Sequence, residues 1–274
     1  MPEGPEIKIA ADKIANAIAL YPITEIFFAF EHLKPYEKIL ARQLVTAVNT
    51  KGKGMLIRFD NGLNIYSHNQ LYGKWMICNA YDYPETKRQL RLAIHNQQKS
   101  ALLYSASDIE VLDEDAIALH PFLSRLGLDV LDSKTTVNNI EARLLNKSFY
   151  RRRFTSLLLD QGFLAGLGNY LRSEILFVAR VHPTRRPVDC SQKQISALAK
   201  AAIAVPQQSY QTQGITNDLK LVQRLKQQGY SHQDYRHWVF GREERPCYIC
   251  NTSIIKDSAG GRRYYYCPQC QSLD

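Results

Sequence analysis

The sequence Met55-Leu-Ile-Arg-Phe-Asp-Asn-Gly-Leu-Asn-Ile-Tyr66 predicts a β-hairpin. Its central Asn61-Gly62 pair separates two runs rich in apolar and β-branched residues, and this dipeptide favours a tight hairpin turn. Further β-rich runs lie on both sides, and the full set covers residues 23–30, 43–49, 54–60, 63–68, 74–79, 90–95 and 100–105. Six or seven short strands joined by tight turns indicate a sandwich or a barrel.

Helical patterns flank this β-rich region. A helix is expected from residue 5 to about residue 20, because Pro5 suits a first helical turn and apolar residues recur on one face at Ile7, Ala11, Ile14 and Ile18. After His120-Pro121 the apolar spacing becomes helical, with candidate helices at 121–126, 136–146, 151–165, 169–180 and 191–204. The polar segment 206–244, rich in Gln and Tyr, receives no assignment.

These patterns predict a multidomain α and β protein with three parts. The boundaries are a β domain over residues 1–120 with a flanking helix, a helical domain over 121–237, and a cysteine-rich tail over 238–274. A hydrophobic content of 45% supports a packed core and argues against disorder.

The charge balance indicates a polyanionic partner. The 35 Lys and Arg residues exceed the 26 Asp and Glu residues by 9, and such an excess attracts nucleic acid or anionic lipid. Nucleic acid is the stronger option, because the sequence contains neither a long cationic amphipathic helix nor a lipidation motif. No apolar run approaches the ~18 residues of a membrane helix, and the N-terminus lacks the pattern of a signal peptide. We therefore expect a cytoplasmic protein without a membrane partner.

The cysteine-rich tail is the strongest local motif. Cys247-Tyr-Ile-Cys250 and Cys267-Pro-Gln-Cys270 form two CxxC pairs. In a reducing compartment this spacing is typical of one tetrahedral Zn²⁺ bound by four thiolates, with a redox pair or chance spacing as the alternative. Four cysteine ligands leave no open coordination position, so the zinc is expected to be structural. Between the pairs, residues 260–266 predict a β-hairpin whose tip is basic.

The N-terminal residues Met1-Pro2-Glu3-Gly4-Pro5-Glu6 allow two interpretations. Removal of Met1 would expose Pro2 as a secondary amine, and a terminal amine has an unperturbed pKa of about 7.7–8.0. Such an amine gives an iminium cation with a sugar aldehyde, and Glu3 could serve as an acid beside it. The simpler interpretation is that the prolines start a helix whose dipole the glutamates favour.

Two further segments combine turn residues with polar or aromatic side chains. Lys53 stands between two glycines, where the backbone can approach a ligand closely, although a solvated loop lysine is more common. Residues 66–73 end a strand with Gln70, Leu71 and Tyr72 in succession. These side chains could fill a gap in a base stack or could belong to ordinary strand packing.

A glycine-rich turn at residues 160–174 joins two helical segments. Asn169 is expected to cap the second helix, whose N-terminus could also bind phosphate through its N–H groups. Arg125 and residues 151–153 add positive charge nearby in the sequence.

Taken together, the motifs resemble the formamidopyrimidine-DNA glycosylase and endonuclease VIII family of DNA repair enzymes. The resemblance runs from the Met1-Pro2-Glu3 start through Lys53 and the Gly166-Leu-Gly-Asn169-Tyr turn to the four-cysteine finger. Within the family, the segments 66–73, 103–110 and 120–123 look like the endonuclease VIII branch, which acts mainly on oxidised pyrimidines. The order of the motifs carries the resemblance, because each one alone is weak.

The resemblance implies a fold and a reaction. The fold is an N-terminal β-sandwich, a helix–two-turn–helix domain and a C-terminal zinc finger, with damaged duplex DNA in the cleft between domains. The reaction is base excision followed by abasic-site cleavage through a Schiff base and β,δ-elimination. We expect a monomer with one structural Zn²⁺ bound by Cys247, Cys250, Cys267 and Cys270.

The resemblance also implies roles for individual residues. Pro2 matches the Schiff-base nucleophile and Glu3 the acid that helps to open the deoxyribose ring. Lys53 matches the proton donor for β-elimination, and Arg262 the finger arginine linked to δ-elimination and phosphate binding. The residues matched to DNA contacts are Gln70, Leu71, Tyr72, Arg125 and Asn169. The inserted side chains would stabilise the state in which the damaged nucleotide is flipped out of the stack.

Other functions remain open at this level. One is a glycosylase directed at oxidised purines, the substrate of the formamidopyrimidine branch. Another is a non-catalytic protein that binds damaged DNA on the same scaffold, for which loss of Pro2, Glu3 or Lys53 would be the signature. A third is an RNA-binding zinc-ribbon protein, which competition between abasic DNA and structured RNA would distinguish.

Overall fold

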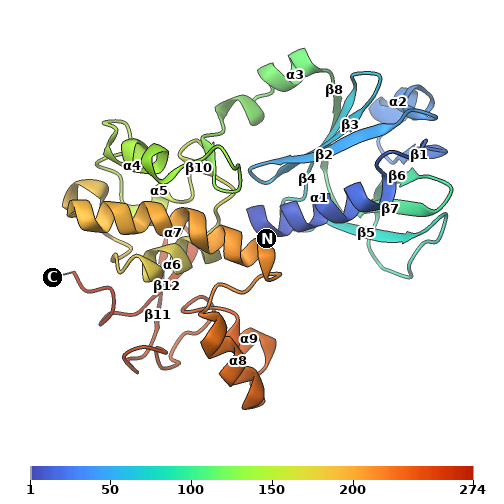
Figure 1. Ribbon diagram of the computed structural model, residues 1–274. Helices are drawn as coiled ribbons and strands as arrows, with labels where there is room; N and C mark the ends of the chain where they lie inside the picture. The colour runs from blue at the N-terminus through green and yellow to red at the C-terminus, as the bar shows by residue number, and fades with distance from the viewer. Residues whose placement is uncertain (1, 274) are drawn as a thin grey trace. The chain divides into compact units, whose positions relative to one another are not determined.

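The computed structural model describes residues 2–273, which form two compact units (Figure 1). The sandwich unit comprises residue 2 and residues 6–125, and the helical unit comprises residues 3–5 and 126–273. The tail with the four cysteines belongs to the helical unit. The three domain ranges expected from the sequence stay predictions.

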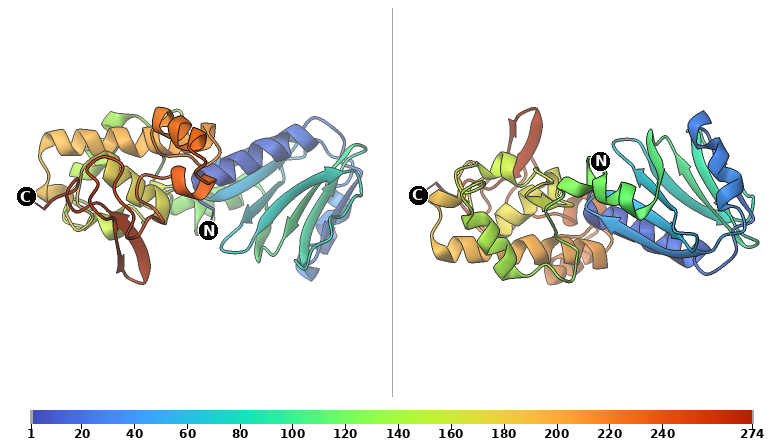
Figure 2. Two further views of the ribbon diagram at one scale, coloured as in Figure 1. Left: turned by 90° about the horizontal axis from the view of Figure 1, so that it is seen from below. Right: turned by 90° about the horizontal axis from the view of Figure 1, so that it is seen from above.

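Two four-stranded antiparallel sheets build the sandwich unit, in the strand orders β1-β6-β7-β5 and β2-β3-β4-β8. Figure 2 shows both sheets with α1 running alongside. The strands are β1 (Glu25–Phe28), β2 (Val45–Lys51), β3 (Gly54–Phe59), β4 (Asn64–His68), β5 (Lys74–Asn79), β6 (Leu90–His95), β7 (Lys99–Tyr104) and β8 (Asp108–Leu112). The helices are α1 (Gly4–Ile18), η1 (Glu31–Leu33), α2 (Lys34–Leu40), α3 (Glu114–Leu119) and η2 (Leu123–Arg125).

One apolar core joins both sheets to α1. Ile14 and Ile18 of α1 are completely buried together with Ile57 of one sheet and Ile94 of the other. Because the inner faces of both sheets share these contacts, the predicted sandwich is confirmed. The Asn61-Gly62 turn is also confirmed, since Gly62 takes a φ of +83° and the N–H of Phe59 donates to the carbonyl of Leu63 at 3.0 Å.

The helical unit packs α6 and α7 around a second apolar core and attaches the tail to α6. Its helices are α4 (Val137–Leu145), α5 (Phe154–Leu157), α6 (Asn169–Val178), η3 (Pro187–Asp189), α7 (Gln192–Gln211), α8 (Leu219–Gln227) and α9 (His232–Tyr235). Its strands are β9 (Leu128–Asp129), β10 (Leu164–Ala165), β11 (Ile255–Ala259) and β12 (Arg262–Tyr266). The predicted tail hairpin is the β11–β12 pair, which projects from this unit in both views of Figure 2.

Several predicted elements differ from the structure. The helix expected over 151–165 is wrong, because only Phe154–Leu157 is α-helical. A turn follows in which the Asp160 carboxylate accepts the N–H of Gly162 at 2.8 Å and pairs with Arg152 at 2.6 Å. The chain then forms β10, which pairs in parallel with β9. Residues 121–126 contain only the 3₁₀ turn η2, and the sequence patterns did not reveal β8 or α2.

The unassigned segment 206–244 contains the end of one helix and two further short helices. Helix α7 continues through Pro206 to Gln211, and α8 and α9 follow. Pro206 is buried with the face of α7 that packs in the core, so tertiary packing outweighs the backbone hydrogen bond that a proline cannot make. Among residues 2–273, no helix combines the length and apolar character needed to cross a bilayer.

Candidate functional site

Lys53 lies in a two-residue turn between β2 and β3. Lys51 pairs with Gly54, and Gly52 takes a φ of +60°, as glycine does at the first position of a type II′ hairpin turn. A Cβ on Gly54 would lie 2.9 Å from Cε2 of the buried Tyr66, so this turn needs glycine on both sides of Lys53. Lys53 is only 9% exposed, which is rare for lysine. The alternative of a solvated loop lysine is therefore wrong.

The segment with Gln70, Leu71 and Tyr72 is a tight turn after β4. The N–H of Gly73 donates to the carbonyl of Asn69 at 2.8 Å, and Gln70 takes a left-handed φ of +47°. Leu71 is 59% exposed and Tyr72 is 70% exposed, so the alternative of ordinary strand packing is wrong for these two side chains. An exposed Leu-Tyr pair on a fixed turn offers apolar surface to a partner.

His68 supports this turn at its base. The Nδ1 atom of His68 accepts the N–H of Gln70 at 3.1 Å, and its ring packs edge-on against Phe122 with 5.5 Å between centroids. Burial lowers the pKa of His68, with the charge of Lys53 acting in the same direction and that of Asp108 opposing it. A neutral imidazole keeps Nδ1 available as an acceptor at neutral pH.

Arg125 ends the 3₁₀ turn η2 and is exposed. Burial and hydrogen bonds fix this turn. Leu123 is fully buried, and Nδ1 of His120 accepts the N–H groups of Phe122 and Leu123 at 3.1 and 3.2 Å. A fixed turn therefore presents the Arg125 guanidinium at the surface.

Glu3 is the N-terminal residue whose surroundings are most informative. It is 4% exposed, and its carboxylate accepts the N–H groups of Gly168 at 2.7 Å, Tyr170 at 2.9 Å and Leu171 at 3.2 Å. The carboxylate thus lies at the N-terminus of α6, where the helix dipole and free N–H groups stabilise an anion. Glu6, the other glutamate of this segment, lies in the first turn of α1. Pro2, directly before Glu3 in the chain, is half-buried.

The expected capping role of Asn169 is wrong. Asn169 is the first residue of α6. The N-cap position is occupied by Gly168, which has no side chain to accept a capping hydrogen bond. Glu3 satisfies these N–H groups instead, across 165 or more residues of sequence. The Oδ1 atom of Asn169 is buried and has no hydrogen-bond partner within residues 2–273. A buried acceptor without a partner is costly, so Oδ1 is suited to a donor supplied by a ligand or by water.

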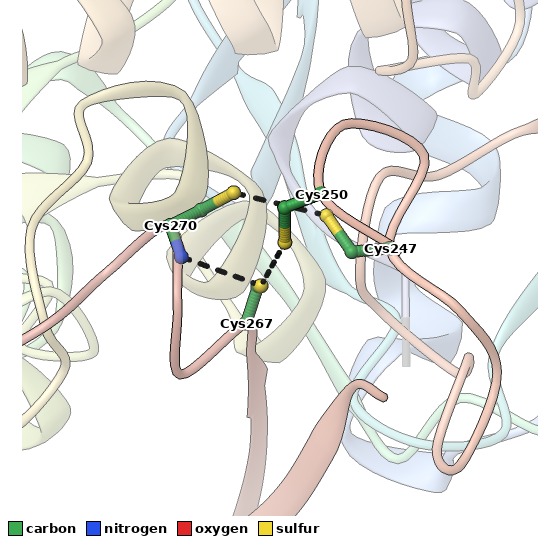
Figure 3. A group of neighbouring side chains, drawn as sticks. All are labelled: Cys247, Cys250, Cys267 and Cys270. Carbon is green, nitrogen blue, oxygen red and sulfur yellow. Dashed lines mark hydrogen bonds between the residues drawn. The ribbon is translucent and has the colours of Figure 1, made fainter. Parts of the chain in front are cut away.

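Four sulfur atoms gather in the tail (Figure 3). The Sγ atoms of Cys247, Cys250, Cys267 and Cys270 lie within 4.8 Å of one another. Cys250 and Cys267 are 3.3 Å apart and Cys247 and Cys270 are 3.9 Å apart, close to the ~3.8 Å expected around a tetrahedral ion with metal–sulfur bonds of about 2.3 Å. Burial and the neighbouring sulfurs raise the pKa of Cys270, so holding all four as thiolates requires a cation. The residues present fit a metal ion.

The hairpin of β11 and β12 carries Arg262 at the start of β12. Ala259 pairs with Arg262 across the turn, and both turn glycines take positive φ angles. Arg262 is exposed and lines an open pocket of about 350 Å³ with Arg152, Asp160 and Gly260. Arg152 is paired with Asp160 at 2.6 Å, so the net positive charge of this pocket comes from Arg262, whose guanidinium is suited to an anionic ligand.

The structure distributes the predicted residues over both units. The sandwich unit carries Pro2, Lys53, Gln70, Leu71, Tyr72 and Arg125, and the helical unit carries Glu3, Asn169, Arg262 and the four cysteines. Within the helical unit, α6 brings Glu3 and Asn169 together. The sequence patterns assigned no role to Arg172 of α6, whose side chain is completely buried. The burial of Arg172 could have been suspected only from its place within an apolar helix face.

Comparison with known proteins gives one consistent result. The N-terminal domain model of formamidopyrimidine-DNA glycosylase matches residues 1–106, and the model of its helix–two-turn–helix domain matches residues 126–220. Endonuclease 8 of Salmonella schwarzengrund is 45% identical and that of Klebsiella pneumoniae 46% identical, each over 99% of this chain and all of the relative.

Solved structures agree at the level of the fold. The structure of Lactococcus lactis Fpg in complex with DNA containing an abasic site has a TM-score of 0.81 and 20% identity, over 98% of this chain and 99% of that one. The sequence relatives and the domain models together define the family. The chain belongs to the formamidopyrimidine-DNA glycosylase and endonuclease 8 family of bifunctional DNA glycosylases and abasic-site lyases, which act on damaged DNA in base-excision repair.

Proposed function

We propose that this chain removes mainly oxidised pyrimidines from duplex DNA and then cleaves the abasic strand by β,δ-elimination. Pro2 is the nucleophile, and its nitrogen bonds to C1′ of the damaged nucleotide as the base leaves. The observation that carries the proposal is the buried Glu3 carboxylate, fixed by three backbone N–H groups directly beside Pro2 in the chain. A carboxylate held next to the nucleophile in the chain is placed to take part in proton transfer during opening of the deoxyribose ring.

The lyase steps follow from the iminium cation. Its positive charge acidifies the C2′ proton, whose loss breaks the C3′–O3′ bond and releases the 3′ phosphate group. We assign the proton donor of this step to Lys53, which its turn holds with little exposure. Loss of the C4′ proton then breaks the C5′–O5′ bond, and we assign contact with the departing phosphate to Arg262.

DNA binding and base flipping are assigned to the remaining residues. The exposed side chains of Leu71 and Tyr72, with Gln70, are proposed to fill the space left by the flipped nucleotide. Arg125 and Asn169 are proposed to contact the DNA backbone. The unpartnered Oδ1 of Asn169 supports this assignment, because a bridging water could connect it to a phosphate.

We propose one Zn²⁺ in the four-cysteine cluster. With four thiolate ligands it supplies no activated water and serves to hold the tail that carries Arg262. Metal analysis of the purified protein is expected to give one zinc per chain, and chelation is expected to weaken DNA binding and lower the melting temperature. A chelated protein with unchanged melting temperature would contradict the assignment.

Borohydride trapping tests the central step. Incubation with DNA that carries an abasic site and borohydride is expected to yield a covalent complex, and Pro2→Gly is expected to abolish it. Mass spectrometry of the preparation establishes that Met1 has been removed. Equal trapping by Pro2→Gly would contradict the proposal.

A panel of oxidised-base duplexes tests the substrate. We expect faster incision at oxidised pyrimidines than at oxidised purines, with 3′-phosphate ends as the mark of δ-elimination. The reverse preference would assign the chain to purine lesions, and binding without incision would indicate a damage-sensing protein.

A further inference from the structure

Arg172 of α6 is an arginine that the proposed reaction does not use. It is 0% exposed, and it is the largest of the fully buried side chains in the part of the chain described. Buried arginines are rare unless their guanidinium groups are paired. Its partners therefore indicate why it is there.

The Arg172 side chain donates its hydrogen bonds to backbone carbonyls of the helical unit. Nη1 donates to the carbonyl of Thr155, and Nη2 donates to the carbonyl of Arg263 at 2.8 Å, with a longer contact of 3.5 Å to that of Arg262. The guanidinium also lies over the Tyr264 ring, 5.5 Å from its centroid. Arg172 thus contacts three successive residues of β12.

The next residue of α6 extends this contact. Ser173 accepts the N–H of Tyr265 on its Oγ at 3.1 Å, and the same hydroxyl donates to the carbonyl of Asn169 at 3.0 Å. Arg172 and Ser173 therefore bind the backbone of β12 to α6 from residue 262 to residue 265. The helix that binds Glu3 at its N-terminus also holds the strand that carries Arg262.

Charge connects the same groups. Burial lowers the pKa of Arg172 to about 10, while the charge of Glu3 raises it and that of Arg262 lowers it further. The guanidinium remains protonated at neutral pH. It lies within electrostatic range of both Glu3 and Arg262, so loss of its position would disturb both.

We propose that Arg172 is a positioning residue that fixes Arg262 relative to the N-terminus of α6 and so sets the ratio of δ-elimination to β-elimination. This inference rests on the proposed function, in which Arg262 acts on the second phosphate. Arginine is required because its planar guanidinium reaches separate carbonyls at once, whereas a lysine ammonium is a single point charge on a flexible stem.

Arg172→Lys tests the proposal, with Arg242→Lys as the matched control. Arg242 is 3% exposed and also donates to two backbone carbonyls, those of Trp238 and Pro246, and neither of these residues belongs to β12. Both variants are assayed as zinc-loaded full-length proteins on a labelled abasic duplex. The fraction of 3′-phosphate ends is expected to fall at least fivefold for Arg172→Lys, while borohydride trapping stays within twofold of the wild-type protein.

The control defines what overturns the proposal. Arg242→Lys is expected to leave the ratio of end groups unchanged, even where it lowers the melting temperature. An unchanged ratio in Arg172→Lys, or an equal shift in both variants, overturns the assignment. In an Arg262→Ala background, Arg172→Lys is expected to have no further effect on the ratio, and an additional effect there would also overturn it.

Two measurements keep the test independent of folding and of the proposed function. If Arg172→Lys loses zinc, Ser173→Ala tests the same contact. It removes the acceptor of the Tyr265 N–H together with the bond from the hydroxyl to the Asn169 carbonyl within α6, and a smaller shift in the same ratio is expected. Backbone hydrogen exchange at residues 262–266 is expected to accelerate in Arg172→Lys and not in Arg242→Lys. Unchanged exchange would overturn the positioning role, whereas failure of wild-type trapping would overturn only the proposed reaction.

Discussion

The two units hold their candidate functional residues by different means. In the sandwich unit, Lys53 and the turn of residues 69–73 depend on neighbours a few residues away, such as the pairing of Lys51 with Gly54 and the bond from Gln70 to His68. In the helical unit, Glu3 and Arg262 depend on contacts that span 165 and 90 residues. A substitution in the sandwich unit is therefore expected to change either activity or stability, whereas one in the helical unit is expected to change both.

Removal of the Lys53 charge is expected to have the largest effect on activity. Lys53→Met keeps most of the side-chain stem and removes the proton donor, so β-elimination is expected to slow by about 10²–10⁴-fold. The melting temperature is expected to change by only a few degrees, because the turn is held by its backbone. Single-turnover incision and thermal unfolding measure the two effects. The exposed neighbour Lys51→Met is the control, and a comparable loss there would contradict a specific role for Lys53.

Gly168→Ala is expected to couple activity to stability in the helical unit. A Cβ at residue 168 would lie 2.4 Å from the Glu3 carboxylate, which cannot move without losing its three N–H donors. We expect a loss of about 2–4 kcal/mol in the free energy of unfolding, together with at least tenfold slower incision.

Gly62→Ala in the sandwich unit is the comparison for that variant. Nothing lies within 4 Å of a Cβ there, and the cost comes only from the φ of +83°. We expect a loss of about 1 kcal/mol and no change in incision. If Gly168→Ala lowers the free energy of unfolding but leaves the incision rate unchanged, the expected link between stability and activity in the helical unit is contradicted.

Acid is expected to destabilise the helical unit through His237. His237 is 2% exposed, its Nδ1 lies 2.9 Å from the Thr216 hydroxyl, and burial lowers its pKa from 6.5 to about 3. Below pH 6.5 the unfolded chain takes up the proton first, so stability falls as pH decreases towards 3. One such group gives a slope of about 1.4 kcal/mol per pH unit.

Denaturant unfolding from pH 7 to pH 4 measures this slope. The chain has two tryptophans, Trp75 in β5 and Trp238 in the helical unit, so a Trp75→Phe background reports on the helical unit alone. His237→Gln is expected to reduce the slope. The same slope with and without His237 would assign the acid sensitivity to other groups.

Shortening the exposed side chains of the turn after β4 is expected to have the smallest effect on stability and activity. Leu71→Ala and Tyr72→Ala remove side chains that are 59% and 70% exposed, so the free energy of unfolding is expected to change by no more than about 0.5 kcal/mol. Loss of the inserted surface is expected to slow incision of duplex DNA about tenfold. Leu20→Ala, at a residue 78% exposed, is the control, and equal effects of all three would contradict insertion.

Local patterns predicted the parts of the fold that local contacts stabilise. The Asn61-Gly62 pair predicted the turn between β3 and β4, and the apolar face with Ile14 and Ile18 predicted α1. The two CxxC pairs predicted the cluster of four sulfur atoms. The helix expected over 151–165 is restricted to Phe154–Leu157, and the turn that follows, held by the Asp160 carboxylate, leads into β10. That outcome depends on the pairing of β10 with β9, which no local pattern contains.

The sequence by itself therefore determined the family, most of the sandwich strands and the four clustered cysteines, and it predicted the other site residues. Only the tertiary structure decided what holds those residues. The sequence did not reveal that the Glu3 carboxylate binds the N-terminus of α6, where unsatisfied N–H groups must find an acceptor. Arg172 is similar, since a buried guanidinium needs carbonyl partners, and folding supplies them from a strand 90 residues away.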